Sequence, residues 1–282
     1  MLLKVLLIII IAILVLYLLA IMPKLRRNKG LISMDGWLYA HRGLHNKKSG
    51  VPENSLKAFA LAVEKGYGIE LDVQLTKDQI PVVLHDYNLK RACKSDIQVS
   101  SLNYEELKQY RLFKSKERIP TLKEVLKLVD GRVPLIVELK IPWKAERLCS
   151  AVSEILKGYK GFYVIESFNP LGLLWYRKHY PQVIRGQLST DFRREKIEGD
   201  PFQYFLLKHL LMNFLTKPDF IAYHHVYRTG LSFTICRKLY RVKTAAWTIQ
   251  SQEDLEKNLD YFDLFIFDKF IPEEKIQRTR EK

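Results

Sequence analysis

The sequence predicts an α/β fold, a (β/α)8 TIM barrel preceded by one N-terminal transmembrane helix. Three observations lead to this prediction. An uncharged apolar run lies near the start of the 282-residue chain, at residues 5–22. The rest, about 250 residues, has the usual size of one such barrel. Within it, short apolar runs of strand type alternate with helical patterns, which is typical of parallel strands joined by helices.

The apolar run is the first element of the chain. Its eighteen residues, Val5–Met22, would span about 27 Å as a helix, close to the hydrocarbon thickness of a bilayer. A cleaved signal peptide is the alternative, but Leu19–Met22 is a poor small-residue cleavage site. Basic residues follow the run, so the positive-inside rule favours a single-pass protein with a cytoplasmic catalytic domain. The expected parts are an anchor (1–23), a basic juxtamembrane linker (24–36) and the barrel (37–282).

The chain is basic, with a net charge of +15, and residues 1–30 contribute five positive side chains and no acid. A basic domain tethered to a bilayer would be drawn to anionic lipid. A generally basic surface accounts for the charge equally well, and no nucleic-acid-binding motif accompanies it. The three cysteines, Cys93, Cys149 and Cys236, have no C-x-x-C spacing and predict neither a disulfide framework nor a zinc site. We expect no nucleic acid and no obligate protein partner.

Eight apolar runs are predicted as barrel strands. They lie near residues 39, 70, 136, 165, 185, 221, 245 and 265. Amphipathic patterns between them predict helices. One helix starts near Leu56, where Asn54 or Ser55 can serve as the cap, and another starts at a capping box of Thr121 and Glu124. Eight such units favour a closed barrel over an open sheet.

The second predicted strand belongs to a hairpin that brings several ionisable side chains together. Residues 69–76 alternate apolar and polar side chains, so Glu70 and Asp72 project from one side of the strand, roughly 7 Å apart. A turn at residues 77–79 and a returning strand would bring His85 back beside Asp72. Carboxylate oxygens in this arrangement suit Ca²⁺ or Mg²⁺. A solvated polar strand face is the alternative.

Further ionisable side chains are predicted at the same rim of the barrel. His41 ends the first strand, and Glu138 and Lys140 end the strand near residue 136. The active site of a TIM barrel lies at the carboxyl ends of its strands. With the hairpin, six ionisable groups meet at one rim, and core packing does not explain such a set. The sequence therefore predicts a catalytic site there.

These motifs resemble those of the glycerophosphodiester phosphodiesterase family, and the resemblance covers about residues 38–272. Each motif is weak alone, but five occur in the family's order and rough spacing: His41-Arg42-Gly43, Pro52-Glu53-Asn54-Ser55, Glu70-Leu71-Asp72-Val73, His85-Asp86 and Glu138-Leu139-Lys140. Later pieces are similar too: Glu166-Ser167-Phe168, Trp247-Thr248-Ile249 and Phe267-Asp268. Ser55 stands where many members of the family have Thr.

The resemblance implies hydrolysis of a phosphodiester to an alcohol and sn-glycerol 3-phosphate or a related monoester. It implies a divalent metal, Ca²⁺ or Mg²⁺, held by Glu70, Asp72 and Glu138, which would stabilise the charge that develops on the phosphoryl oxygens. Arg42 and Lys140 are expected to bind the substrate phosphate.

The resemblance also implies that His41 and His85 act as general base and general acid, in an order that the sequence does not give. Glu53 is expected to contact the metal, a histidine or a substrate hydroxyl. The alternative for Glu53 is a structural charge at a helix N-terminus.

A nearly apolar helical pattern covers residues 202–215, between the strands near residues 185 and 221. A barrel helix packed in the core is the favoured interpretation. The alternative is an amphipathic element on the membrane beside the active site, which would make the substrate a lysophospholipid and the enzyme a lysophospholipase D. Two further alternatives stay open: a phospholipase of the same barrel type that acts on intact lipids, and an inactive binder of lipid head groups.

Overall fold

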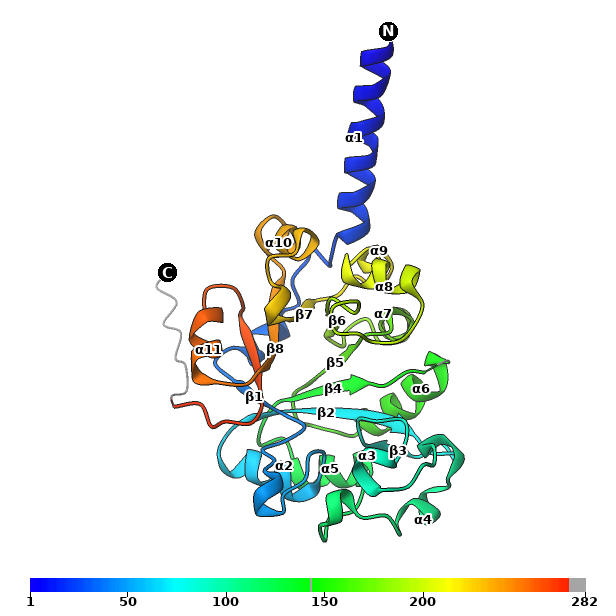
Figure 1. The fold of residues 1–282 in the computed structure, drawn as a ribbon, viewed down its shortest axis with the longest axis vertical. Helices are drawn as coiled ribbons and strands as arrows, with labels where there is room; N and C mark the ends of the chain where they lie inside the picture. Colours follow the sequence, from blue (N-terminus) through cyan, green and yellow to red (C-terminus); the bar gives the residue numbers. More distant parts are fainter. Residues whose placement is uncertain (143, 274–282) are drawn as a thin grey trace.

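The structure, a computed structural model, describes residues 1–142 and 144–273. Figure 1 shows a long helix, α1 (Leu2–Ile21), standing out from a barrel. Parallel strands follow one another around this barrel, and the last pairs with the first. The eight strands are β1 (Leu38–His41), β2 (Gly68–Leu75), β4 (Leu135–Leu139), β5 (Tyr163–Ser167), β6 (Arg185–Ser189), β7 (Phe220–His224), β8 (Lys243–Ile249) and β9 (Leu264–Phe267). The predicted TIM barrel with a preceding apolar helix is confirmed.

Helices connect the strands around the outside of the barrel. They are α2 (Leu56–Glu64), α5 (Leu122–Val129), α6 (Ala145–Leu156), α7 (Pro170–His179), α8 (Pro201–Lys208), α9 (Asn213–Thr216), α10 (Leu231–Lys238) and α11 (Gln252–Asn258). Short 3-10 turns add η1 (Lys29–Met34), η2 (Lys47–Ser49) and η5 (His225–Tyr227). Of the two cap candidates for α2, Ser55 is the cap, since its hydroxyl accepts from the N–H of Ala58. Thr121 and Glu124 form the predicted capping box of α5.

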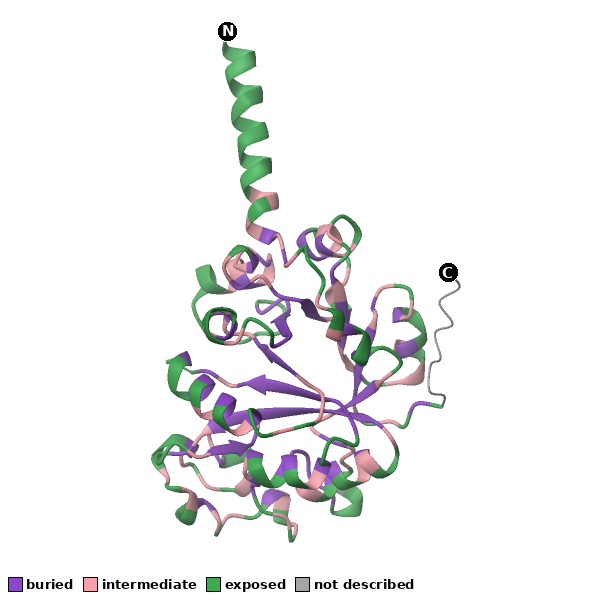
Figure 2. Cartoon of the chain, turned by 180° about the vertical axis from the view of Figure 1, so that it is seen from behind, coloured by how far each residue is buried: buried purple, intermediate pink, exposed green. Residues whose placement is uncertain are grey.

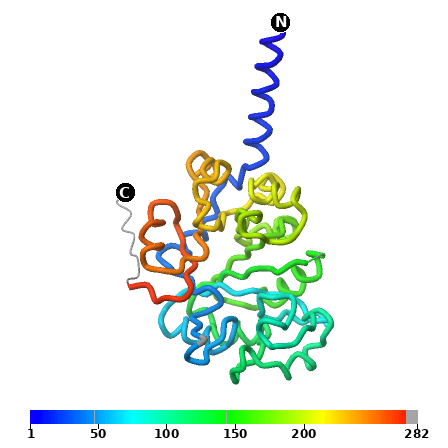
Figure 3. Tube along the Cα trace, viewed as in Figure 1, coloured from blue at the N-terminus to red at the C-terminus, as the bar shows by residue number. Residues whose placement is uncertain are grey.

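A small insertion follows the returning strand of the hairpin. The strand β3 (Pro81–Val83) runs antiparallel to β2, as predicted. The insertion then contains α3 (Lys90–Cys93), η3 (Val99–Ser101), α4 (Tyr104–Leu107) and η4 (Leu112–Lys114), packed on an apolar cluster of its own. In Figure 3 it is the teal part of the tube, at the opposite end of the molecule from the N-terminus.

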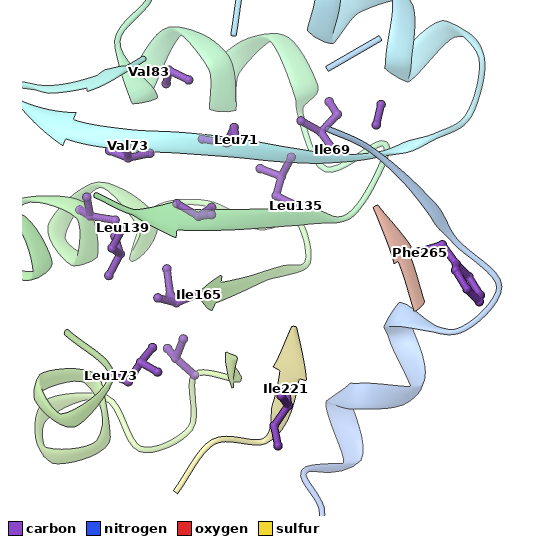
Figure 4. Packing of buried hydrophobic residues seen from close by; sticks show 14 of the residues in the cluster. Ile69, Leu71, Val73, Val83, Leu135, Leu139, Ile165, Leu173, Ile221 and Phe265 are labelled. Atoms are coloured by element: carbon purple, nitrogen blue, oxygen red, sulfur yellow. The ribbon is translucent and has the colours of Figure 1, made fainter. Parts of the chain in front are cut away.

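The barrel strands are buried on both faces, and the alternation along β2 separates two environments. Ile69, Leu71 and Val73 face the surrounding helices in the largest apolar cluster (Figure 4). Glu70 and Asp72 are only 2% and 1% exposed. The face of β2 that carries these two carboxylates is therefore buried, and the alternative of a solvated polar strand face is wrong. Figure 2 shows the same burial along the strands and the exposure of most of α1.

The segment 24–36, expected to be a linker, lies against the barrel. Leu31 and Met34 are 6% and 0% exposed and belong to an apolar cluster with Tyr39, Ile136 and Phe220. The Nζ of Lys24 also lies 2.7 Å from the buried carboxylate of Asp219. This segment is thus part of the packed domain.

Met34→Ala is expected to lower the free energy of unfolding by about 2–5 kcal/mol, because it removes a fully buried side chain and leaves a cavity. Ile32, which is 74% exposed on the same 3-10 turn, provides the matched control, and Ile32→Ala should change stability by less than about 0.5 kcal/mol. Denaturant unfolding of the full chain in detergent measures both. Equal, small effects would show that the segment is a free tether.

The prediction of one helical element over residues 202–215 is wrong in its detail. The chain forms two short helices, α8 and α9, separated by a turn in which Leu210 has a left-handed φ of 56°. This turn lets Leu207 and Leu210 enter the core while Phe202 and Phe205 stay exposed on α8. The segment therefore supplies both core residues and an apolar outer surface.

Candidate active site

The predicted site residues meet at the carboxyl ends of neighbouring strands. In the strand register, His41 of β1 pairs with Glu70 of β2. One row further along, Asp72 of β2 pairs with Glu138 of β4, and Glu138 pairs with Glu166 of β5. Alternate side chains of such strands point into the barrel. The register thus stacks the carboxylates in adjacent layers at the catalytic end of the fold.

Glu70, Asp72 and Glu138 form a compact, buried acidic trio. One carboxylate oxygen from each lies within 4.8 Å of the other two. Burial raises the pKa of Glu70 well above its ordinary value, and the nearby charges of Asp72 and Glu138 raise it further. Three converging carboxylates match the oxygen donors that a hard divalent cation takes, and a cation would relieve their repulsion. The residues present therefore fit a metal.

Two basic side chains border the trio. The Nζ of Lys140 lies 2.9 Å from Glu138 Oε1 and 3.6 Å from Asp72 Oδ1. The Nε of Arg42 lies 3.2 Å from Asp72 Oδ2. Burial by itself would raise the pKa of Asp72, but His85, Arg42 and Lys140 hold it well below its ordinary value. Asp72 is therefore the member of the trio that stays ionised most readily.

A tight turn sets the position of Arg42. Its backbone has a left-handed φ of 58°, and Gly43 follows with a φ of 80°. A Cβ at Gly43 would lie 3.0 Å from the backbone carbon of Ala58, so the turn needs glycine there. In this conformation the backbone N–H of Arg42 donates to Glu70 Oε2 over 3.1 Å. The turn thus joins the start of the His41-Arg42-Gly43 motif to the acidic trio.

Each of the two predicted catalytic histidines has a carboxylate beside Nδ1. His85 Nδ1 lies 2.6 Å from Asp86 Oδ1, and His41 Nδ1 lies 3.6 Å from Asp268 Oδ2. The Nε2 of His41 lies 3.9 Å from Glu70 Oε2. Burial lowers the pKa of His41, and the charge of Arg42 lowers it further. The contact with Asp86 fixes the His85 imidazole so that its other ring nitrogen can exchange a proton, whereas Nδ1 of His41 has no hydrogen-bond partner among the described residues.

Glu53 lies among guanidinium groups and outside the acidic trio. Its Oε1 accepts from Arg42 and from Arg91, both over 2.7 Å. Burial by itself would raise the pKa of Glu53, but hydrogen bonds from Arg91 and the charge of Arg42 lower it to about 2. Glu53 is thus placed to orient Arg42 by its charge.

Several neighbours of the site were not predicted as site residues. Asn54, considered as a helix cap, instead donates its amide to Asp72 Oδ2 over 2.8 Å. Asp268 lies between His41 and His45, with His45 Nε2 2.9 Å away. Asp268 directly follows the last residue of β9, and this position could have identified it. Arg91 lies in the insertion, where no pattern in the sequence points to the site.

Glu166 is a further buried acid that the sequence placed in a motif without a role. It is 1% exposed, and its Oε2 has no hydrogen-bond partner among the described residues. Burial raises its pKa well above the ordinary value, and Glu138 and Asp72 raise it further. An orphaned acceptor beside three carboxylates is a second sign that this end of the barrel fits a cation.

The other half of the rim is aromatic. Phe168, just after β5, has its ring centroid 5.5 Å from that of Trp247 and 5.8 Å from that of Phe192. Phe192 in turn stacks on Tyr204 of α8 at 4.5 Å. His224, at the end of β7, lies edge-on to Trp247 at 4.9 Å. The mouth of the barrel therefore combines a charged side with an aromatic side, which suits an amphipathic organic phosphate.

Comparisons with known proteins show the family of this chain. The sequence model of the Glycerophosphoryl diester phosphodiesterase family matches residues 41–265. A glycerophosphodiester phosphodiesterase of Caldanaerobacter subterraneus is 31% identical over 246 residues, which cover 79% of this chain and 90% of the relative. A lysophospholipase D of Rattus norvegicus is 38% identical over 121 residues, which cover 38% of each chain.

Solved structures show the same architecture. An Oleispira antarctica phosphodiesterase in complex with the product sn-glycerol-3-phosphate aligns with a TM-score of 0.68 and 26% identity, covering 84% of this chain and 94% of that one. A glycerophosphodiester phosphodiesterase from Thermotoga maritima aligns with a TM-score of 0.63 and 25% identity, covering 82% and 94%. Because the family match spans most of the sequence, the chain belongs to the glycerophosphoryl diester phosphodiesterase family and is a phosphoric diester hydrolase.

Proposed function

We propose that the protein is a metal-dependent phosphodiesterase that hydrolyses glycerophosphodiesters to an alcohol and sn-glycerol 3-phosphate. The observation that carries this proposal is the buried acidic trio of Glu70, Asp72 and Glu138, flanked by His41 and His85. The product named in the Oleispira antarctica complex supports the same substrate class.

In this proposal Glu70, Asp72 and Glu138 hold Ca²⁺ or Mg²⁺, which when bound stabilises negative charge on the phosphoryl oxygens. Arg42 and Lys140 bind the phosphate from either side of Asp72. Glu53 keeps the guanidinium of Arg42 oriented through their 2.7 Å ion pair.

His41 and His85 carry the proton transfers. One imidazole takes a proton from the water that attacks phosphorus, and the other gives a proton to the alcohol oxygen as the P–O bond breaks. Asp86 orients the His85 ring through Nδ1, and Asp268 faces Nδ1 of His41 at 3.6 Å. Such a pair needs one histidine neutral and the other protonated, so the rate should be bell-shaped in pH.

A lysophospholipid is a second candidate substrate. The lysophospholipase D relative is one reason to consider it. The other is α8, where Phe202 and Phe205 are 68% and 53% exposed while Tyr204 stacks on Phe192 at the aromatic side of the mouth. An acyl chain could follow this apolar surface while the phosphodiester enters the charged side.

Choline release from two substrates separates these candidates. We expect the full-length chain in detergent to release choline from glycerophosphocholine with Ca²⁺ or Mg²⁺ and to lose this activity in EDTA. Release from lysophosphatidylcholine alone would make the enzyme a lysophospholipase D. Metal-independent release would contradict the metal site, and no release from either diester would contradict both substrates. The full chain is required because residues 24–36 pack on the barrel.

We also infer that α1 is retained as a single-pass anchor. Its hydropathy averages 3.2 over a membrane-length window. Its last residue, Ile21, is fully buried, and the backbone oxygen of Ile21 accepts from Asn213 Nδ2 and from Cys236 Sγ. Cleavage after this helix would remove a core residue and leave these donors unpaired, which supports an anchor over a signal peptide. The basic residues after α1 favour a cytoplasmic barrel.

A further inference from the structure

The foot of α1 is fixed to the barrel and leaves only part of the helix free for the bilayer. The hydroxyl of Tyr17 lies 2.8 Å from Ser232 Oγ, and the hydroxyl of Tyr240 donates to the backbone oxygen of Leu18 over 2.9 Å. Residues from Leu2 to Leu16 are exposed, and none of them makes a side-chain contact of this kind with the described part of the barrel. The foot of the helix is thus part of the domain.

This attachment holds the surface around the foot of α1 close to the membrane in which α1 is anchored. Residues 2–16 are exposed and apolar apart from Lys4, so this part of the helix is free to lie in the hydrocarbon core. Because Tyr17 and Leu18 are bonded to Ser232 and Tyr240, the barrel surface begins where this free part ends. That surface therefore lies at the level of the membrane interface.

Around this foot, three helices carry exposed apolar side chains. Figures 1 and 2 show α8, α9 and α10 flanking the lower end of α1. The exposed residues, which we call the anchor-side patch, are Phe202 (68%), Phe205 (53%), Phe214 (46%), Leu231 (67%) and Leu239 (61%). Large exposed apolar residues on adjacent helices mark an interaction surface, and aromatic rings favour the head-group level of a bilayer.

The positive charge of the same region favours binding to an anionic surface. Residues 1–31 carry five Lys or Arg, residues 201–217 carry two and residues 231–241 carry three, and none of these segments contains Asp or Glu. The hollow that Arg27, Arg237 and Arg241 share is lined by six Lys or Arg and four Asp. Basic groups near a membrane surface are attracted to anionic lipid.

We propose that the anchor-side patch is a second membrane-binding element, which embeds α8, α9 and the ends of α10 in the interface of an anionic bilayer. Interfacial helices sink about 5–10 Å into the boundary of head groups and acyl chains. The proposal rests on the proposed retention of α1 as an anchor.

This docking would set the mouth of the barrel beside the membrane, opening along the membrane plane. In Figure 1, β2 and β4 run across the direction of α1, so the barrel lies on its side beneath the membrane. The patch residue Phe205 is next to Tyr204, which stacks on Phe192 at the mouth. Diester lipids in the facing leaflet would then lie beside the aromatic side of the site.

The depth of Phe205 in vesicles tests the proposal. Full-length protein with Cys93→Ser and Phe205→Cys is labelled with the fluorophore NBD and reconstituted in phosphatidylcholine and phosphatidylglycerol vesicles. The remaining cysteines, Cys149 and Cys236, are fully buried and should not react. The matched control is Gln109→Cys, an exposed position beside α4 at the far end of the molecule. We expect blue-shifted emission and several-fold stronger quenching by nitroxide-labelled lipids at position 205 than at position 109.

Three other outcomes would overturn the proposal. Protein that does not float with the vesicles would contradict both the membrane anchor and the docking of the patch. Protein that floats but is quenched equally at both positions would agree with the anchor and contradict the docking. A label at position 205 that is shielded from water without quenching by lipid would assign the patch to a protein partner. Because none of these readouts needs turnover, failure of the proposed hydrolysis would be seen separately.

Discussion

His41→Ala is expected to lower kcat by about 10²–10⁴-fold, because it removes one of the two groups that transfer protons during hydrolysis. His85→Ala should have an effect of the same size. Since both imidazoles act in one step, the double variant should be little worse than either single variant. Steady-state hydrolysis of glycerophosphocholine measures all three.

The control for these variants is His179→Ala. His179 stacks on Trp175 at the end of α7, away from the acidic trio, and its loss should leave kcat unchanged. Circular dichroism of every variant checks that a loss of kcat does not come from unfolding. If either catalytic variant kept near-parent kcat, the acid–base assignment would be wrong.

Glu70→Gln is expected to remove metal-dependent activity, with a loss of about 10³-fold, or ~4 kcal/mol of transition-state stabilisation. The amide keeps the shape of the side chain but is a much weaker ligand for a hard cation than a carboxylate. Titration of activity with Ca²⁺ and Mg²⁺ measures the effect. Turnover at the metal concentration that suffices for the parent would exclude Glu70 from the ligand set.

Glu70→Gln should lower activity but raise the stability of the metal-free protein. Burial and the nearby charges of Asp72 and Glu138 raise the pKa of Glu70, so the ionised form is destabilised in the folded metal-free protein. A raised carboxyl pKa in the folded state means that stability falls as pH rises from the unfolded pKa through the folded pKa. In EDTA at neutral pH, Glu70→Gln should therefore melt at a higher temperature than the parent. Added metal should raise the Tm of the parent and have little effect on the variant.

The local elements of this protein follow from its sequence alone. Alternating apolar residues define strands such as Ile69–Leu75, and the pattern of strands and helices predicts a closed barrel of eight units. Caps such as Thr121 with Glu124 involve atoms three residues apart, so the sequence shows both partners together. The rim chemistry of Glu70, Asp72 and Glu138 was predictable for a related reason, because the fold brings the carboxyl ends of its strands to one place.

Only the tertiary structure decided the interactions between distant segments. Glu53 could be expected beside a metal or a histidine, but its partner Arg91 is thirty-eight residues away in an insertion without regular periodicity. Asn54 could cap a helix, yet it binds Asp72 because the loop after β1 folds over β2. Residues 24–36 read as a linker, since no periodicity shows that Leu31 and Met34 pack against the barrel. Local pattern reports which face of an element is apolar, whereas the identity of the group that covers this face depends on the closed barrel.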